Sequence, residues 1–251
     1  MVDWEHALGH DNWPDYVFNN HDAIRSATRL HALVGNSEVA LAPHGDLEDD
    51  ARLKVLATLL LTLRGTPFMY YGEEIGMRDI PIRSKDAVLD PVGRRFWPFI
   101  KGRDGCRAPM QWDAAPNAGF ASAGVAPWLP VHPDAAARNV AAQQADPRSL
   151  YSVYASLIAL RRDSPALAGG LFLPLSHGRR TILAYLRQTP EQTLLVALNF
   201  THRRQRLVLG NHLARSQWRV RFSTHPRVAS SIIDDLLLPL APDEALVLEL
   251  R

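Results

Sequence analysis

The clearest helical pattern in the chain lies between residues 47 and 64. Four leucines recur there at the spacing of one helix face, namely Leu53, Leu56, Leu60 and Leu63. The acidic residues 48–50 precede them, where the positive end of the helix dipole favours negative charge, and Gly65 supplies a stop signal. We therefore predict a helix over 47–64 whose leucine face is buried against a large apolar partner such as a sheet.

Two runs of β-favouring residues flank this helix. Residues 16–19 predict a short buried strand that ends in the polar group 20–22. Residues 66–71 are apolar at nearly every position, which is typical of a parallel strand covered on both faces. Strand, helix and strand together predict a βαβ unit, with candidate chemistry at the polar end of the first strand.

A long stretch without periodicity follows, over residues 76–148. It is rich in proline, glycine and tryptophan, and loops of this length are rare unless they are functional, so we interpret it as an active-site excursion. Within it, the alanine-rich residues 135–145 predict a short exposed helix. Ser149 then predicts the cap of a helix that runs to about Arg162 and ends before the proline of 163–165.

The pattern changes beyond residue 168 to short β-favouring runs at hairpin spacing. These runs cover residues 181–186, 193–200, 206–209, 218–222 and 246–250. They predict an antiparallel β domain. No repeat of 20–50 residues is visible, which argues against solenoids and propellers.

Composition narrows the classes of partner. The 251 residues are 47% apolar, and 28 lysines and arginines against 26 acidic residues leave a net charge of +2, so we expect no nucleic-acid or membrane partner. The longest apolar stretch falls short of the ~20 residues that cross a bilayer. A single cysteine and an N-terminus without a signal-peptide pattern predict a cytoplasmic location.

Three segments, taken together in this order and spacing, resemble a known family. They are Phe-Asn-Asn-His-Asp at 18–22 with Arg25 and Arg29 behind it, Arg-Gly-Thr-Pro-Phe-Met-Tyr-Tyr-Gly-Glu-Glu-Ile-Gly-Met at 64–77, and Gly-Arg-Asp-Gly-Cys-Arg-Ala-Pro-Met-Gln-Trp-Asp at 102–113. The chain is similar to glycoside hydrolase family thirteen, the α-amylase superfamily, and in particular to its α-glucosidase and oligo-1,6-glucosidase branch. Residues 197–200 resemble the centre of the family's C-terminal β-sandwich.

The resemblance implies a fold that combines an α/β part with an all-β part. Residues 1–168 would be the C-terminal part of a (β/α)8 TIM barrel, holding its last two βα units and a long active-site insert. Residues 169–251 would be an antiparallel β-sandwich domain. Because a complete barrel needs about 200 or more residues, we expect a truncated gene product or one piece of a split enzyme, with the missing N-terminal half of the barrel as a partner.

The same resemblance implies three site residues. Asp22 resembles the aspartate that hydrogen-bonds the glucosyl 2- and 3-hydroxyls and stabilises an oxocarbenium-like transition state, and His21 resembles a hydroxyl donor on the same ring. Arg107 matches an arginine that lines the pocket near the reducing side of the bond. From the residues alone, a satisfied polar turn at 20–22 and a surface ion pair for Arg107 remain open.

The rest of the catalytic set is not recognisable. Retaining glycosidases need a nucleophile and an acid about 5–5.5 Å apart, and the resemblance places both on strands that come before Asn20. The acidic residues before it match neither motif; they are Asp3, Glu5, Asp11 and Asp15. Glu73 and Glu74 could substitute at the end of a barrel-type strand, but a structural pair that buttresses the loop is the preferred interpretation.

The sequence therefore predicts the C-terminal portion of a retaining α-glucosidase that acts on α-linked gluco-oligosaccharides, of the malto or isomalto type, and is inactive alone. The alternative is a sugar-binding or partner-docking fragment without chemistry.

Other candidate sites have simpler interpretations. His6 and His10 have the i, i+4 spacing of a metal pair, yet no third ligand is apparent, so we predict neither a metal nor a cofactor. Cys106 is interpreted as a packed thiol and Asp104 as a loop-ordering residue. The basic run 202–206 is interpreted as a solvated loop rather than a nucleic-acid platform.

Overall fold

The computed structural model describes residues 9, 12–32, 47–175, 181–210, 213, 216–227, 231–233 and 237–251. The chain divides into two compact units. The first, here called the sheet unit, comprises Met1–Tyr16, Lys54–Pro67 and Val153–Arg251. The second, here called the insert unit, comprises Val17–Leu53 and Phe68–Ser152.

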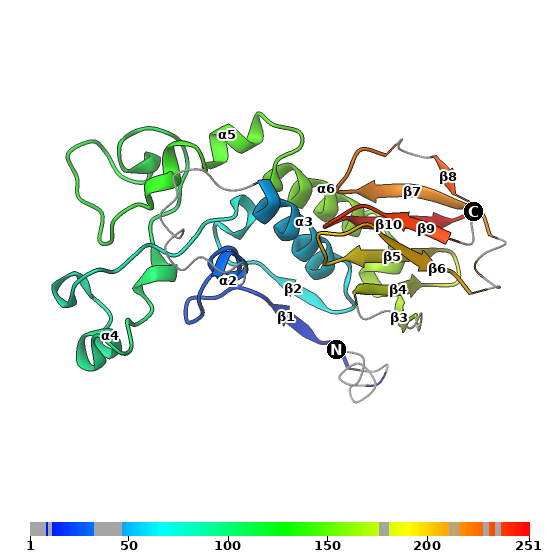
Figure 1. Cartoon of the computed structure of the whole chain (residues 1–251), viewed down its shortest axis with the longest axis horizontal. Helices are drawn as coiled ribbons and strands as arrows, with labels where there is room; N and C mark the ends of the chain where they lie inside the picture. The colour runs from blue at the N-terminus through cyan, green and yellow to red at the C-terminus, as the bar shows by residue number, and fades with distance from the viewer. Residues whose placement is uncertain are drawn as a thin grey trace. The chain divides into compact units, whose positions relative to one another are not determined.

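The described part of the sheet unit holds a six-stranded antiparallel sheet in the order β3-β4-β5-β10-β7-β8 (Figure 1). Its strands are β3 (Leu171–Pro174), β4 (Ile182–Gln188), β5 (Thr193–Asn199), β10 (Ala245–Leu250), β7 (Trp218–Ser223) and β8 (Ile232–Ile233). A second antiparallel pair consists of β6 (Gln205–Val208) and β9 (Leu237–Leu240). The antiparallel pairing confirms the five strands predicted from the hairpin spacing.

The two sheets share one apolar core. Leu195 and Leu248 of the large sheet belong to the same buried cluster as Leu207 and Leu238 of the small one. Along β9 the exposed Leu237 alternates with the buried Leu238, which is the period-two pattern of a strand with one covered face. Each leucine that becomes fully buried contributes roughly 1.5–3 kcal/mol, so this core is a large part of what stabilises the unit.

Helical residues cover the other face of the large sheet. The predicted helices are present as α3 (Leu47–Thr62) and α6 (Leu150–Arg162). Val55 of α3 and Leu160 of α6 lie in one buried cluster with Val196 of β5, which confirms that the leucine-rich helix packs against a sheet. The Oγ atom of Ser149 accepts the N–H of Ser152 at 3.1 Å, so the predicted cap of α6 is also confirmed.

Two arginines satisfy backbone carbonyl groups around the C-terminal end of α3. Arg187 of β4 is fully buried, and Arg161 of α6 is partly buried. The acceptors are the carbonyl oxygens of Thr62, Leu167 and Gly170 for Arg187, and of Leu61, Leu63 and Gly65 for Arg161. Since the last carbonyls of a helix have no partner inside it, these guanidinium groups take that role.

Two short strands, β1 (Asp15–Val17) and β2 (Thr66–Phe68), form a separate pair. The predicted burial of these strands is wrong, because Val17 is 47% and Phe68 is 50% exposed. The predicted lengths are wrong as well, since each strand has only three residues. A strand with apolar side chains on both faces becomes buried only when a layer covers each face, and the described residues leave these side chains open.

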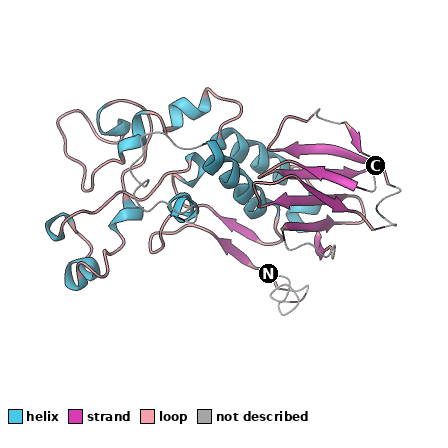
Figure 2. Ribbon diagram, viewed as in Figure 1, coloured by secondary structure: helices cyan, strands magenta, loops and turns pink. Residues whose placement is uncertain are grey.

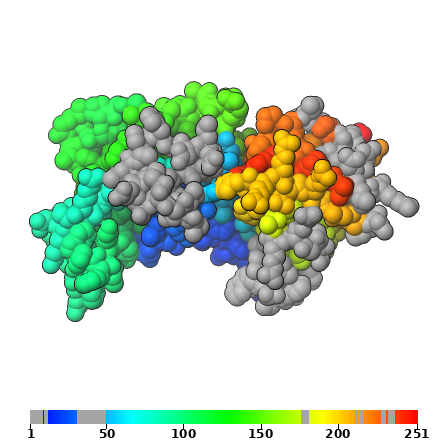
Figure 3. All heavy atoms as spheres, viewed as in Figure 1, coloured from blue at the N-terminus to red at the C-terminus, as the bar shows by residue number. Residues whose placement is uncertain are grey.

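The insert unit is built mostly from loops and short helical turns (Figure 2). Its elements are α2 (Ser26–Ala32), η2 (Glu73–Ile75), η3 (Lys85–Ala87), α4 (Pro91–Phe96), η4 (Asp104–Arg107), η5 (Pro116–Gly119), η6 (Pro133–Ala136) and α5 (Val140–Gln144). It has an apolar cluster of its own, which includes Ile75, Met77, Val88 and Met110. In the space-filling view, the atoms of the insert unit that are drawn in green pack closely on one another (Figure 3). No described helix has the length and apolar character needed to span a membrane.

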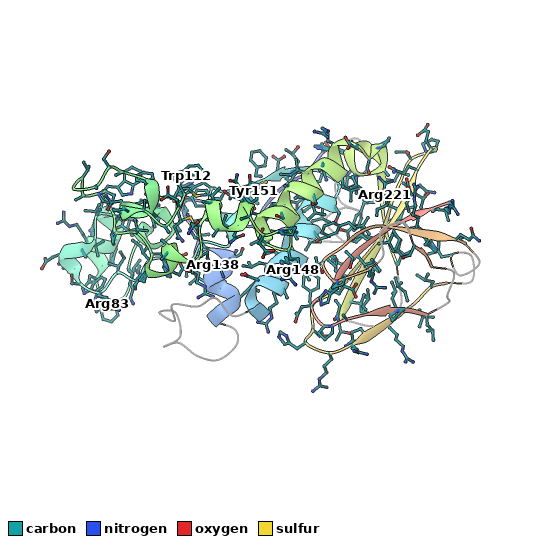
Figure 4. The ribbon with its side chains drawn as sticks, turned by 90° about the horizontal axis from the view of Figure 1, so that it is seen from above. Arg83, Trp112, Arg138, Arg148, Tyr151 and Arg221 are labelled. Carbon is teal, nitrogen blue, oxygen red and sulfur yellow. The ribbon has the colours of Figure 1, made fainter. Side chains whose placement is uncertain are left out.

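The single exposed helix predicted over 135–145 is wrong. The structure has η6 and α5 instead, and Asn139 caps α5 by accepting the N–H of Ala142 at 2.8 Å. Arg138, labelled in Figure 4, lies between these two turns; its buried guanidinium donates to Ile75 O at 3.0 Å and to Asp50 Oδ1 at 2.9 Å. The polar residues Arg138 and Asn139, which an alanine count ignores, thus interrupt the predicted helix, and their hydrogen bonds stabilise the interruption.

Candidate functional site

Asp22 lies on an exposed turn that buried Asn19 anchors. The N–H of Asp22 donates to Asn20 Oδ1 at 2.9 Å, which closes a tight turn. Asn19 Nδ2 donates to Glu73 Oε2 at 2.7 Å, and Asn19 Oδ1 accepts the N–H of Ser26 at the start of α2. The turn is thereby fixed from below, while the side chain of Asp22 stays 54% exposed.

Two arginines from the insert hold one oxygen of the Asp22 carboxylate. Nη1 of Arg103 and Nη2 of Arg107 each lie 3.1 Å from Oδ1 of Asp22. The hydrogen bond from Arg103 is the main reason that the pKa of Asp22 lies below its usual value; desolvation opposes it, and His21 and Arg107 add to the lowering. Asp22 is therefore a carboxylate over the whole neutral range.

The three residues predicted for the site lie together. Nε2 of His21 is 3.3 Å from Oδ2 of Asp22, and the carbonyl oxygen of His21 accepts Nε of Arg107 at 2.8 Å. Arg107 thus contacts both neighbours, through its ion pair with Asp22 and through this backbone bond. Their roles toward a substrate stay predictions.

Arg103 and Asp90 belong to the same network and were not predicted as site residues. Asp90 is buried, and its Oδ2 accepts both the backbone N–H and Nε of Arg103 at 2.8 Å. Its Oδ1 caps α4 by accepting the N–H of Val92 at 3.0 Å. The hydrogen bond from Arg103 is the main reason that the pKa of Asp90 is well below its usual range. The only signal in the sequence was the Asp-Pro step at 90–91, which is typical of a helix start and says nothing about Arg103.

Arg25 is a buried cation beneath the turn. Its Nη1 donates to Tyr71 O at 2.7 Å and its Nη2 to Cys106 O at 2.9 Å. The guanidinium also lies 4.8 Å from the ring centroids of Tyr70 and Tyr71, within the range of a cation–π contact. Arg25 therefore ties the segment after β2 to the turn that carries Arg107.

Glu73 has the structural contacts that were predicted for it. Its Oε2 accepts Asn19 Nδ2 at 2.7 Å and the backbone N–H of Tyr70 at 3.1 Å. Glu74 is half-buried, and this burial raises the pKa of its carboxyl above the usual value, against the effect of nearby backbone N–H groups. The buttressing interpretation is confirmed for Glu73.

The side chains of Asp104 and Cys106 stabilise the loop from inside and do not project into the candidate site. Asp104 Oδ2 accepts the N–H groups of Leu89 at 2.6 Å and Asp90 at 3.0 Å, so the predicted loop-ordering role is confirmed. Cys106 is buried, and burial raises the pKa of its thiol. Within the described ranges, no group of three or more His, Cys, Asp and Glu side chains could hold a metal ion. His6 and His10 lie outside the described residues.

Residues 1–170 match the α-amylase family, in the part described as the α-amylase catalytic domain, and the chain belongs to this family. The family assignment made from the three segments is thereby confirmed. A probable α-glucosidase of Rhizobium meliloti is 36% identical over 196 residues, which cover 78% of this chain and 33% of that protein. An oligo-1,6-glucosidase of Parageobacillus thermoglucosidasius is 33% identical over 230 residues, which cover 85% of this chain and 38% of that one.

Solved structures of a trehalulose synthase and an isomaltulose synthase have a similar fold. The trehalulose synthase MutB from Pseudomonas mesoacidophila MX-45 superposes with a TM-score of 0.78 at 26% identity, over 98% of this chain and 44% of that chain. An isomaltulose synthase mutant from Erwinia rhapontici NX5, in complex with D-glucose, gives a TM-score of 0.79 at 27% identity, over 100% of this chain and 45% of that chain. The chain thus spans between a third and a half of the length of the relatives it matches.

Proposed function

We propose that this chain is the C-terminal portion of a retaining α-glucosidase-type hydrolase that acts on α-linked gluco-oligosaccharides. In this proposal Asp22 stabilises the oxocarbenium-like transition state, His21 orients the glucosyl ring, and Arg107 lines the reducing side of the bond. The observation that carries it is the carboxylate of Asp22, which two arginines contact on a half-exposed turn. The similarity to α-glucosidases and oligo-1,6-glucosidases supports the same substrate class.

The geometry suits a carboxylate that accepts hydrogen bonds from sugar hydroxyl groups. Both arginines approach Oδ1, whereas His21 approaches Oδ2 from 3.3 Å. Oδ2 is therefore the oxygen that accepts the sugar hydroxyls, with the imidazole of His21 beside it. Fixed contacts of this kind strengthen as positive charge develops on the ring, which lowers the barrier to reaction.

The proposal assigns β1 and β2 to the last βα units of the barrel and places the nucleophile and the acid outside these 251 residues. The greater length of the relatives supports it. So do the exposed apolar side chains of Val17, Phe68 and Met69, which a complete barrel would cover. The partner is then a polypeptide that carries the front half of the barrel.

Hydrolysis of an aryl α-glucoside tests the proposal. The purified chain alone is expected to be inactive, because no nucleophile can form the covalent intermediate. The chain mixed with a polypeptide bearing the front half of the barrel is expected to turn over, and Asp22→Asn should lower kcat of the mixture by about 10²–10³-fold. Asp163→Asn, at an exposed carboxylate, is the control.

The contrary result is robust turnover by the lone chain that Glu73→Gln or Glu74→Gln abolishes. Such a result would show that these glutamates supply the missing carboxylates. The exposed apolar strand residues also favour the alternative of a non-catalytic sugar-binding or docking fragment. Sugar binding that depends on Asp22 without turnover in the mixture supports that alternative.

A further inference from the structure

Arg107 is the last residue of a helical turn that is too short to hold it in place. This turn, η4, has four residues, and Ala108 directly after it leaves the helical region with a ψ of 154°. Turns of this type have poor hydrogen-bond geometry and rarely run further. The guanidinium of Arg107 nevertheless meets two acceptors at once, His21 O at 2.8 Å and Asp22 Oδ1 at 3.1 Å. Contacts from outside η4 must therefore fix the backbone from which this side chain extends.

The peptide groups on both sides of Arg107 are held by side chains from other segments. Before it, Cys106 O accepts Nη2 of Arg25 at 2.9 Å, and this arginine is buried. After it, Ala108 O accepts the hydroxyl of Tyr71 at 2.7 Å. Arg107 thus lies between two carbonyl groups that are each anchored, one by a buried cation and the other by a tyrosine from the segment after β2.

Tyr71 contributes to this arrangement mainly through its hydroxyl group. It is 38% exposed, so it gains only part of the stabilisation that a fully buried ring provides. The residue is itself fixed, because its carbonyl oxygen accepts Nη1 of Arg25 at 2.7 Å and its ring centroid lies 4.8 Å from the same guanidinium. A hydroxyl on a ring held in this way donates along a set direction, and its hydrogen bond to Ala108 O fixes the backbone that follows Arg107.

We propose that Tyr71 is a positioning residue for sugar binding, and that its hydroxyl acts through the peptide group after Arg107 to hold this arginine against Asp22. Without the hydroxyl, that peptide group gains freedom which binding must remove again, and the apparent affinity falls. The inference rests on the proposed function, since it assigns Tyr71 to the same sugar site. It adds a residue that acts on the site through another side chain.

Calorimetric titration of the chain with maltose and isomaltose tests this role in a double-mutant cycle. Tyr71→Phe keeps the ring and its contact with Arg25 and removes only the hydroxyl. It is expected to raise the Kd of the sugar that binds by about three- to tenfold, as the loss of one hydrogen bond does. In the Arg107→Ala background the same change should have no effect, because the side chain that it positions is gone. Independent, additive effects of the two changes would overturn the proposal.

A matched control separates positioning from general stability. Tyr151, labelled in Figure 4, is another tyrosine of the insert unit, and its hydroxyl accepts Nε2 of Gln144 at 3.0 Å. Tyr151→Phe should leave the Kd within about twofold, while urea denaturation shows that both single variants remain folded. Equal losses of affinity in Tyr71→Phe and Tyr151→Phe would reveal an effect of stability alone. Full affinity in Tyr71→Phe, with a loss only in Tyr71→Ala, would assign the effect to the ring and disprove the role of the hydroxyl.

The outcomes also separate this inference from the proposed function. If Asp22→Asn abolishes binding but Tyr71→Phe leaves the Kd unchanged, the positioning role is disproved and the proposed function stands. If the unaltered chain binds neither sugar, both ideas fail.

Discussion

The Nη1 atom of Arg103 lies 3.1 Å from Oδ1 of Asp22, although 81 positions separate the two residues in the chain. Arg103 is in turn fixed by the buried carboxylate of Asp90, which accepts its Nε at 2.8 Å. A buried acid therefore positions the arginine that contacts the carboxylate of the candidate site. This chain of contacts makes Asp90 a positioning residue.

Replacing Asp90 with Asn should destabilise the chain by about 1–3 kcal/mol, because Arg103 loses a charged acceptor that is removed from water. The cap of α4 is partly kept, since Asn also caps helices well. Urea denaturation measures the change. Asp86→Asn, at an exposed carboxylate of the same unit, is the control. A loss for Asp90→Asn no larger than that of the control would contradict the positioning role.

The carboxyl of Glu249 should make the stability depend on pH in acid. Burial alone would raise its pKa, but hydrogen bonds from Gln192, Arg219 and Arg221 outweigh this and lower the pKa to about 2, from its ordinary value of 4.5. A group with a lowered folded pKa stabilises the protein above its unfolded pKa and loses this effect as the pH falls through the folded value. Glu249 therefore stabilises the chain above pH 4.5 and ceases to do so near pH 2.

Urea denaturation of the unaltered chain and of Glu249→Gln, each at several pH values, checks this. The difference in free energy of unfolding should be constant from pH 7 to about 5 and should shrink as the pH falls further. A difference that stays the same down to pH 3 would show that the ion pairs of Glu249 do not persist in solution.

Cys106 should resist thiol reagents in the folded chain. It is 2% exposed, its Sγ lies 3.1 Å from Arg103 O, and burial raises the pKa of the thiol, so little thiolate forms at neutral pH. Labelling with a disulfide reagent should proceed at the rate of unfolding and become fast in urea. Fast labelling without urea would contradict the packed-thiol interpretation.

Local patterns were sufficient to predict most of the regular elements. The leucine period in 47–64 and the hairpin spacing beyond residue 168 gave α3, α6 and five strands, because each of these elements buries one face within the chain. The prediction for 66–71 failed because a run of apolar residues shows that a strand can be covered, not that a layer covers it. The strands β3 and β9 were missed, and the proline in each of them hides the pattern.

The residues of the candidate site were likewise predicted only in part. Asp22, His21 and Arg107 were found through family segments, and the structure brings them into contact. Arg103 and Asp90 were missed because the insert has no periodicity from which to infer contacts between its parts. The predicted domain boundary at 168/169 stays a prediction. The two compact units of the structure are separated within α3 and within α6, so they follow a different division of the chain.

Calorimetric titration with maltose or isomaltose, for the unaltered chain and for Asp22→Asn, tests the central claim most directly. Asn keeps the shape of the side chain but removes the charge that Arg103 and Arg107 hold in place. The account predicts saturable binding that Asp22→Asn abolishes and that Asp163→Asn leaves intact. Equal binding by the unaltered chain and Asp22→Asn, or no heat of binding for either, would contradict it.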